Sequence, residues 1–134
     1  MEVQETLPAA LRLLVVDDEP IVGKRLRQAY AKLGFEVETF TSGAPALAAM
    51  AEHPFEIVVT DLMMAGVDGW EVLRRVRDLS PAARVIVITA YAGEDTAAEA
   101  RRQGAFDCLA KPFRLEALKQ SIFRAWEEVL RQAG

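Results

Sequence analysis

Charged and hydroxylic residues stand at the ends of four apolar stretches of the chain, and together they could carry out phosphoryl transfer. Asp17 and Asp18 follow the first stretch, Asp61 the second, Thr89 ends the third and Lys111 follows the fourth. Grouped carboxylates offer oxygen ligands to Mg²⁺, and a carboxylate can also attack phosphorus. A lysine and a hydroxyl could neutralise the remaining phosphoryl charge. An aspartyl phosphate would fit these residues if the fold brings them together.

Each of these residues has a simpler interpretation when it is considered alone. Asp61 could be a loop or helix-cap residue, and Asp17 with Asp18 could be a turn before a helix. Thr89 and Lys111 would be ordinary residues at strand ends. Only a common location in the fold would favour the chemical interpretation over these alternatives.

The hydrophobic pattern predicts five strands that alternate with five helices. Apolar runs rich in β-branched residues predict buried strands, and an alternating run predicts a half-exposed edge strand. The expected strands cover about residues 11–16, 35–40, 55–60, 84–89 and 105–110. Helical spacing, caps and Gly or Pro stops predict helices at about residues 20–33, 44–51, 69–79, 95–103 and 115–131.

This alternation predicts a single-domain (βα)5 doubly wound parallel sheet with helices on both faces. In such a sheet, the ligand site lies beyond the carboxyl ends of the strands. Asp17, Asp18, Asp61, Thr89 and Lys111 all stand at those ends. The fold would therefore deliver them to one edge of the sheet, which favours the chemical interpretation.

The composition is that of one ordinary globular domain. The 134 residues carry a formal net charge of −4 and one cysteine, and 51% of them are hydrophobic. The mild acidity argues against direct nucleic-acid binding, and no apolar run reaches the roughly 20 residues needed to cross a membrane. We expect a cytoplasmic chain with a flexible lead-in at 1–10, one domain at 11–131 and a tail at 132–134.

Four motifs occur in order along the chain. They are Val15-Val16-Asp17-Asp18-Glu19-Pro20, Asp61-Leu62-Met63-Met64-Ala65-Gly66-Val67-Asp68-Gly69, Ile88-Thr89-Ala90 and Lys111-Pro112-Phe113. With them the chain resembles the receiver domain of two-component response regulators, from about Leu11 to Arg131. The resemblance implies a flavodoxin-like fold with strand order 2-1-3-4-5 and a phosphoprotein that acts in phosphorelay signal transduction.

The resemblance also implies a role for each site residue. Asp61 would be the phosphoacceptor, which takes a phosphoryl group from a sensor histidine kinase or a phosphotransfer protein. Mg²⁺ would be bound by Asp18 and Asp61, by Asp17 largely through water, and by the backbone carbonyl of Met63. Lys111 would pair with the phosphate. The chain would not be an enzyme beyond its own phosphorylation and dephosphorylation.

A phosphorylation switch is the expected output of such a domain. Thr89 would be the switching hydroxyl, and the Lys111–Pro112 bond would be cis, as the resemblance implies. The face formed by the fourth helix, fifth strand and fifth helix would then change its affinity for an effector or for a second copy of the chain. Cys108 stands where receivers often carry an aromatic ring, so we hypothesise that Tyr91 shields the site or partly replaces that ring. A rim tyrosine without a switching role is the alternative.

The last predicted helix carries two apolar stripes. The stripe expected to face the sheet contains Leu115, Leu118, Ile122, Ala125 and Val129. A second stripe contains Phe123, Trp126 and Leu130. It is either a surface for a partner or dimer, or it packs against the first strand and helix of the same domain.

Two other functions are weaker alternatives. A Mg²⁺-dependent aspartyl-phosphate hydrolase usually places its nucleophile and a second acid two residues apart after the first strand, whereas Asp17 and Asp18 are adjacent and Asp61 follows another strand. A flavin-binding module would need a Ser/Thr/Gly-rich phosphate loop after the first strand. The acidic Asp17-Asp18-Glu19 sequence would instead repel phosphate.

Overall fold

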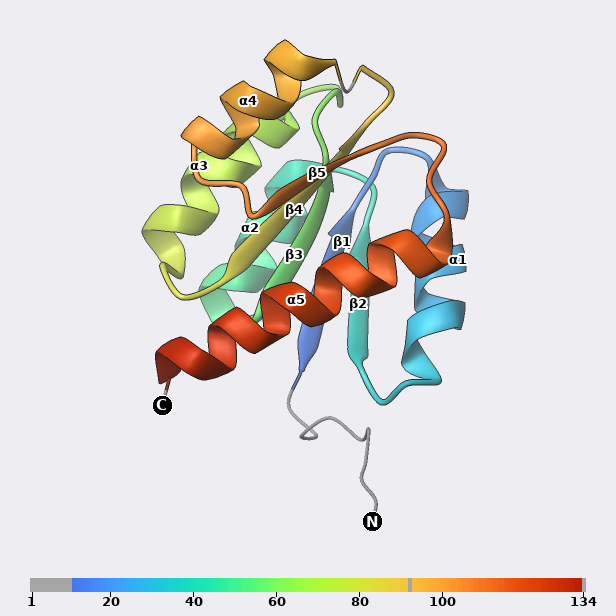
Figure 1. Cartoon of the computed structure of the whole chain (residues 1–134), viewed down its shortest axis with the longest axis vertical. Coiled ribbons are helices and arrows are strands. Elements are labelled where there is room, and N and C mark those ends of the chain that lie inside the picture. Colours follow the sequence, from blue (N-terminus) through green and yellow to red (C-terminus); the bar gives the residue numbers. More distant parts are fainter. Residues whose placement is uncertain (1–10, 92, 134) are drawn as a thin grey trace.

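A computed structural model describes residues 11–91 and 93–133 of the chain. They form a parallel five-stranded sheet in the order β2-β1-β3-β4-β5 (Figure 1). The strands are β1 (Arg12–Val16), β2 (Glu36–Phe40), β3 (Ile57–Asp61), β4 (Arg84–Thr89) and β5 (Asp107–Ala110). The predicted fold class and strand order are confirmed, and the edge position of β2 agrees with its alternating sequence.

Five helices connect and cover the strands. They are α1 (Pro20–Ala31), α2 (Gly43–Glu52), α3 (Gly69–Leu79), α4 (Glu94–Arg102) and α5 (Leu115–Ala133). The buried residues form two clusters, one between the sheet and α1 and α5, and one between the sheet and α2, α3 and α4. Figure 1 shows α5 lying across one face of the sheet beside α1, with α2 and α3 behind it. The central strands β1, β3 and β4 are therefore buried on both faces, which explains their continuous apolar sequences.

The predicted domain boundaries can be compared with the structure at the C-terminal end but not at the N-terminal end. The lead-in expected at 1–10 lies outside the described residues, as does Gly134. Helix α5 continues to Ala133, so two of the three residues expected in a tail are helical. No helix among the described residues is long and apolar enough to cross a membrane.

The strand register sets the common edge on which the polar residues stand. Val16 pairs with Thr60, so Asp17 lies beside Asp61 on the neighbouring strand. Asp61 pairs in turn with Ile88, and Thr89 pairs with Ala110. Because the strands are parallel and in this register, the residues at their carboxyl ends emerge side by side.

The second apolar stripe of α5 is used mostly inside the domain. The Phe123 ring meets the Phe35 ring edge-on, with 5.9 Å between their centroids, and Trp126 is buried in the cluster next to α1. Leu130 of that stripe is exposed. In the first stripe, Leu118, Ile122 and Ala125 are fully buried, whereas Leu115 at the start of the helix is exposed, contrary to the prediction. Both stripes therefore contribute buried residues to the core.

A close backbone approach holds the loop between β3 and α3. The amide of Gly69 donates to the carbonyl of Leu62, and Asp68 caps α3 by accepting a hydrogen bond from the amide of Glu71, as the capping-box spacing predicts. A Cβ atom at Gly69 would lie 2.0 Å from the carbonyl oxygen of Asp61. Gly69 therefore lets α3 start directly against the end of β3.

We predict that Gly69→Ala destabilises the domain by on the order of 3 kcal/mol, because backbone atoms of Asp61 and Leu62 must move to admit the methyl group. Gly93→Ala is the matched control, since nothing among the described residues lies within 4 Å of its Cβ position and its φ is −72°. It should change stability by less than about 1 kcal/mol. Urea unfolding of both variants measures the difference, and equal stabilities would contradict the packing argument.

Candidate functional site

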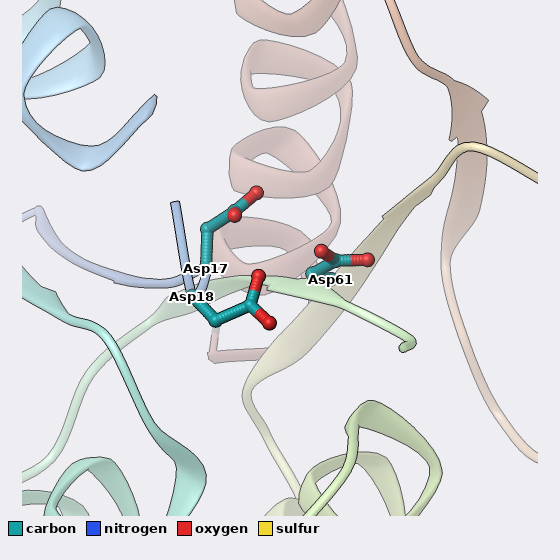
Figure 2. A group of neighbouring side chains, drawn as sticks. All are labelled: Asp17, Asp18 and Asp61. Carbon is teal, nitrogen blue, oxygen red and sulfur yellow. The ribbon is translucent and has the colours of Figure 1, made fainter. Parts of the chain in front are cut away.

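Three aspartates from two neighbouring strand ends form one acid cluster. Asp17 and Asp18 follow β1, and Asp61 is the last residue of β3. One carboxylate oxygen from each lies within 4.8 Å of the other two. Figure 2 shows Asp17 and Asp18 next to each other after β1, with Asp61 of β3 beside them. Asp17 and Asp61 are buried, with 1% and 5% of their surface exposed, while Asp18 is open to solvent.

Lys111 supplies the positive charge inside this cluster. Its Nζ lies 2.8 Å from Oδ2 of Asp17 and 3.1 Å from Oδ2 of Asp61. It also contacts Oε1 of Glu19 at 3.0 Å. Burial would lower the pKa of Lys111, but its close contacts with the carboxylates of Asp17, Glu19 and Asp61 outweigh this and raise the pKa above its usual value. The lysine is therefore fully charged at neutral pH.

Asp17 is the most confined of the acids. Its Oδ1 accepts a hydrogen bond of 2.9 Å from the amide of Glu19. Burial raises the pKa of Asp17, and the charge of Asp61 adds to this, while Lys111 and the Glu19 amide oppose it. Its Oδ2 is buried and receives no well-aligned hydrogen bond from the described residues, although the Lys111 ammonium is in ion-pair contact.

The donor set fits a hard divalent cation. The grouped ligand atoms are carboxylate oxygens, which suit hard cations such as Mg²⁺ and Ca²⁺ better than softer metals. The buried Oδ2 of Asp17 has a lone pair that no directed donor satisfies, and the exposed carboxylate of Asp18 leaves the cluster open to solvent. A cation there would also offset the repulsion among three acids that share one lysine.

Asp61 is held from both sides. Its Oδ2 faces Lys111, and its Oδ1 accepts a hydrogen bond of 3.2 Å from the amide of Met63. The hydroxyl of Thr60 donates to the carbonyl of Asp61. The Met63 side chain itself is exposed, so this residue meets the site through its backbone. Asp61 thus presents a fixed, partly neutralised carboxylate to the edge of the sheet.

Thr89 follows Ile88, which pairs with Asp61, and Tyr91 lies two residues further along the chain. Thr89 ends β4 and is buried, and its Oγ1 accepts a hydrogen bond of 3.1 Å from the amide of Tyr91. The Tyr91 ring is 68% exposed. The Tyr91 side chain therefore stands mostly in solvent and not in the core.

Cys108 lies on β5, on the face of the sheet that α2, α3 and α4 cover. Burial raises the pKa of its thiol, although Arg101 opposes this. The thiol is therefore protonated at neutral pH and is a small packing residue. The Lys111–Pro112 peptide bond that follows β5 is cis.

Asp17, Asp18, Asp61 and Lys111 lie together as the sequence predicts, whereas Glu19 received no role from the sequence. This residue appeared only as part of the Asp17-Asp18-Glu19-Pro20 motif. In the structure its carboxylate reaches Lys111, which is 92 positions away in the chain. The adjacency of a third acid to the strand-one pair was the available signal.

The geometry can now be compared with known proteins. The family described as response regulator receiver domain matches residues 13–123. The chain belongs to this family. A receiver domain is a regulatory phosphoacceptor of two-component systems, and this chain carries a cluster of three aspartates that could hold a metal ion.

Related proteins and structures agree with this assignment. The chain is 41% identical over 120 residues to the regulatory protein AtoC of Escherichia coli. The aligned part covers 89% of the chain and 26% of AtoC. The solved receiver domain dimer of NtrC4, activated with beryllofluoride, is 34% identical and has a TM-score of 0.83. Its alignment covers 88% of the present chain and 98% of the NtrC4 chain. A response regulator from Burkholderia pseudomallei, solved with a phosphorylated aspartic acid and a calcium ion, is 29% identical, with coverage of 92% and 73% and a TM-score of 0.79.

The chain spans between 26% and 59% of the first three curated relatives that it matches. These relatives are a regulatory protein and two transcriptional regulatory proteins. The receiver fold accounts for the shared part.

We predict that Asp17→Asn stabilises this receiver domain by on the order of 1 kcal/mol at pH 7 without divalent metal, because it removes a buried charge from a crowded cluster. The pKa of Asp17 is raised on folding, so its charge weakens the fold as pH rises through that carboxyl's titration range. The stabilisation by Asp17→Asn should therefore become smaller as the pH is lowered, because Asp17 then becomes protonated in the wild type.

Thermal unfolding in chelator, from acid to neutral pH, measures this effect. Asp18→Asn is the matched control at an exposed neighbour and should stabilise less. A loss of stability in Asp17→Asn at pH 7 would contradict the prediction.

Proposed function

We propose that Asp61 accepts a phosphoryl group from a sensor histidine kinase or a phosphotransfer protein, in a Mg²⁺-dependent reaction. The observation that carries this proposal is the position of the Lys111 ammonium, which lies 2.8 Å from Asp17 and 3.1 Å from Asp61 inside the acid cluster. A carboxylate nucleophile, a metal-binding pair and a fixed cation are then present at one sheet edge. These are the groups that phosphoryl transfer requires.

The chain's own residues have separate tasks in this reaction. A carboxylate oxygen of Asp61 attacks phosphorus, an O–P bond forms, and the P–N bond to the donor imidazole breaks. The imidazole leaves with the bonding electron pair and takes up a proton. Lys111 pairs with the incoming phosphoryl oxygens, and the Thr89 hydroxyl donates to another of them.

Mg²⁺ would be held by Asp17, Asp18, Asp61 and the backbone carbonyl of Met63, and would neutralise phosphoryl charge. The domain needs no further catalytic group, because its chemistry is limited to its own phosphorylation and dephosphorylation. We propose that it meets its donor in the cytoplasm.

The surface around the acid cluster supports a protein as the phosphoryl donor. Four of the large apolar side chains exposed among the described residues lie on segments that follow strand ends at this edge: Ile21, Met63, Tyr91 and Leu115. Such residues bind a folded partner better than they bind a small metabolite. A kinase or phosphotransfer domain could cover them while its histidine reaches Asp61.

Phosphorylation is proposed to change the affinity of the face formed by α4, β5 and α5 for an effector or a second copy of the chain. On this face Asp107 accepts hydrogen bonds from the Ser121 hydroxyl and from Arg124, at 2.8 and 3.1 Å, and lies 3.7 Å from Arg101. An effector domain or a second copy of the chain could exchange these ion pairs. Cys108, beneath α4, would then take part in switching only as a small residue that permits movement of neighbouring groups.

We predict one phosphate adduct when the intact protein is incubated with Mg²⁺ and acetyl phosphate, and none without Mg²⁺. Asp61→Asn should abolish the adduct because the nucleophile is lost. Asp68→Asn is the matched control, since it makes the same change at the α3 cap and keeps the cap oxygen. Mass spectrometry of the intact chain measures the adduct. An adduct that persists in Asp61→Asn, or none in the wild type, would refute the assignment.

We predict that Tyr91→Ala shortens the half-life of the phosphorylated form severalfold, because its ring at the rim of the site limits the access of water. Tyr91→Phe keeps the ring and should behave as the wild type. The decay of radiolabelled phosphoprotein gives both half-lives. If Tyr91→Ala changes neither the half-life nor the affinity for a partner, the ring has no tuning role.

A further inference from the structure

A third carboxylate shares the ammonium of Lys111. Oε1 of Glu19 lies 3.0 Å from Lys111 Nζ, as close as the carboxylates of Asp17 and Asp61. The lysine therefore has three acid partners before any phosphoryl group arrives. Two of them belong to the proposed metal and acceptor groups, whereas Glu19 has no part in either.

Glu19 is fixed at its backbone and free at its side chain. Its amide donates to Oδ1 of Asp17, and it occupies the position before the first turn of α1. Its carboxylate makes no capping hydrogen bond to the described part of that helix. The side chain is 62% exposed, compared with 15% for Lys111. Its role in the fold is thus small, and its main contact is the ion pair.

The ion pair borders an open cavity. A cavity of about 430 Å³ is lined by both Glu19 and Lys111, and also by Ala90 and Pro112. The Glu19 side chain is mostly exposed beside this cavity, whereas Lys111 is held by three carboxylates. Glu19 can therefore approach or leave the ammonium without repacking the core.

We propose that Glu19 is a positioning residue that competes with the phosphoryl group for Lys111 and so lowers the domain's affinity for that group. This inference rests on the proposed function of Asp61 and Lys111. Once Asp61 carries the phosphoryl group, Glu19 remains as an anionic partner of the lysine outside the acceptor and metal groups. Each hydrogen bond that the ammonium keeps with Glu19 is lost to the phosphoryl oxygens.

Simple electrostatics gives the same sign. The carboxylate of Glu19 carries a negative charge one ion-pair length from the lysine that faces Asp61, so it also repels an incoming anion. An exposed pair of this kind is weak and exchanges readily. The effect should therefore be a tuning of a few fold, much smaller than the loss expected when Lys111 itself is removed.

The test uses Glu19→Gln and two binding titrations followed by tryptophan fluorescence or calorimetry. In the first, beryllofluoride is titrated at saturating Mg²⁺, where it stands in for the phosphoryl group. We expect Glu19→Gln to bind it about threefold more tightly than the wild type does. In the second, Mg²⁺ alone is titrated. Here we expect Glu19→Gln to bind Mg²⁺ about twofold more weakly. A negative charge near the site is lost, and Lys111 then pairs more strongly with Asp17 and Asp61.

The opposite signs separate positioning from structural damage, which would weaken both titrations. Glu52→Gln removes an equal charge from the exposed end of α2 and should leave both unchanged. Glu19→Asp keeps the charge on a shorter side chain and should restore Mg²⁺ binding.

The two proposals fail in different ways. If the wild type does not bind beryllofluoride with Mg²⁺, the assignment of Asp61 and Lys111 fails, and this inference fails with it. If the wild type binds it but Glu19→Gln binds equally or more weakly, only the role of Glu19 is overturned.

Discussion

The site depends on one ammonium placed among buried carboxylates. Asp17 and Asp61 are nearly inaccessible to water, and two such charges side by side would be strongly unfavourable without Lys111. The lysine does not satisfy them fully, since Oδ2 of Asp17 lacks a directed hydrogen bond from the described residues. A cation bound among the acids would therefore offset part of their mutual repulsion.

Strand pairing in the sheet places the acidic residues close together, so few dedicated side-chain contacts are needed to position them. Parallel pairing of β1 with β3 and of β3 with β4 fixes which strand-end residues are neighbours, and the continuous apolar core fixes the pairing. Gly69 then lets α3 begin against the carbonyl of Asp61, which brings the loop of residues 62–68 back to the end of β3. The acid cluster is thus a consequence of register and of one glycine, and each acid needs few contacts of its own.

The fold and the principal site could be predicted from the sequence because each signal is local. A buried strand appears as a β-branched run, its end as a charged residue, and a helix start as the Asp68 and Glu71 pair. Contacts between distant side chains leave no such local pattern. The ion pair of Glu19 with Lys111 spans 92 positions, and the packing of Phe123 on Phe35 joins α5 to the turn before β2. Leu115 was expected in the core, but it stands at the exposed first turn of α5, where helical spacing alone cannot distinguish the end of a buried stripe.

The anchoring of α4 gives the proposed switch a physical basis even without an aromatic ring at position 108. Helix α4, which lies wholly within the described residues, buries only Ala100. A methyl group contributes little burial free energy, about 1 kcal/mol or less, so the helix is held mainly through its connections to β4 and β5. A change at the Thr89 hydroxyl acts directly on the segment that leads into α4, because that hydroxyl accepts a hydrogen bond from the Tyr91 amide. A movement of the Thr89 hydroxyl toward Asp61 would strain this bond and so act on a weakly anchored helix. Such coupling through the backbone needs no ring on β5, and it is compatible with the small, protonated Cys108 found there.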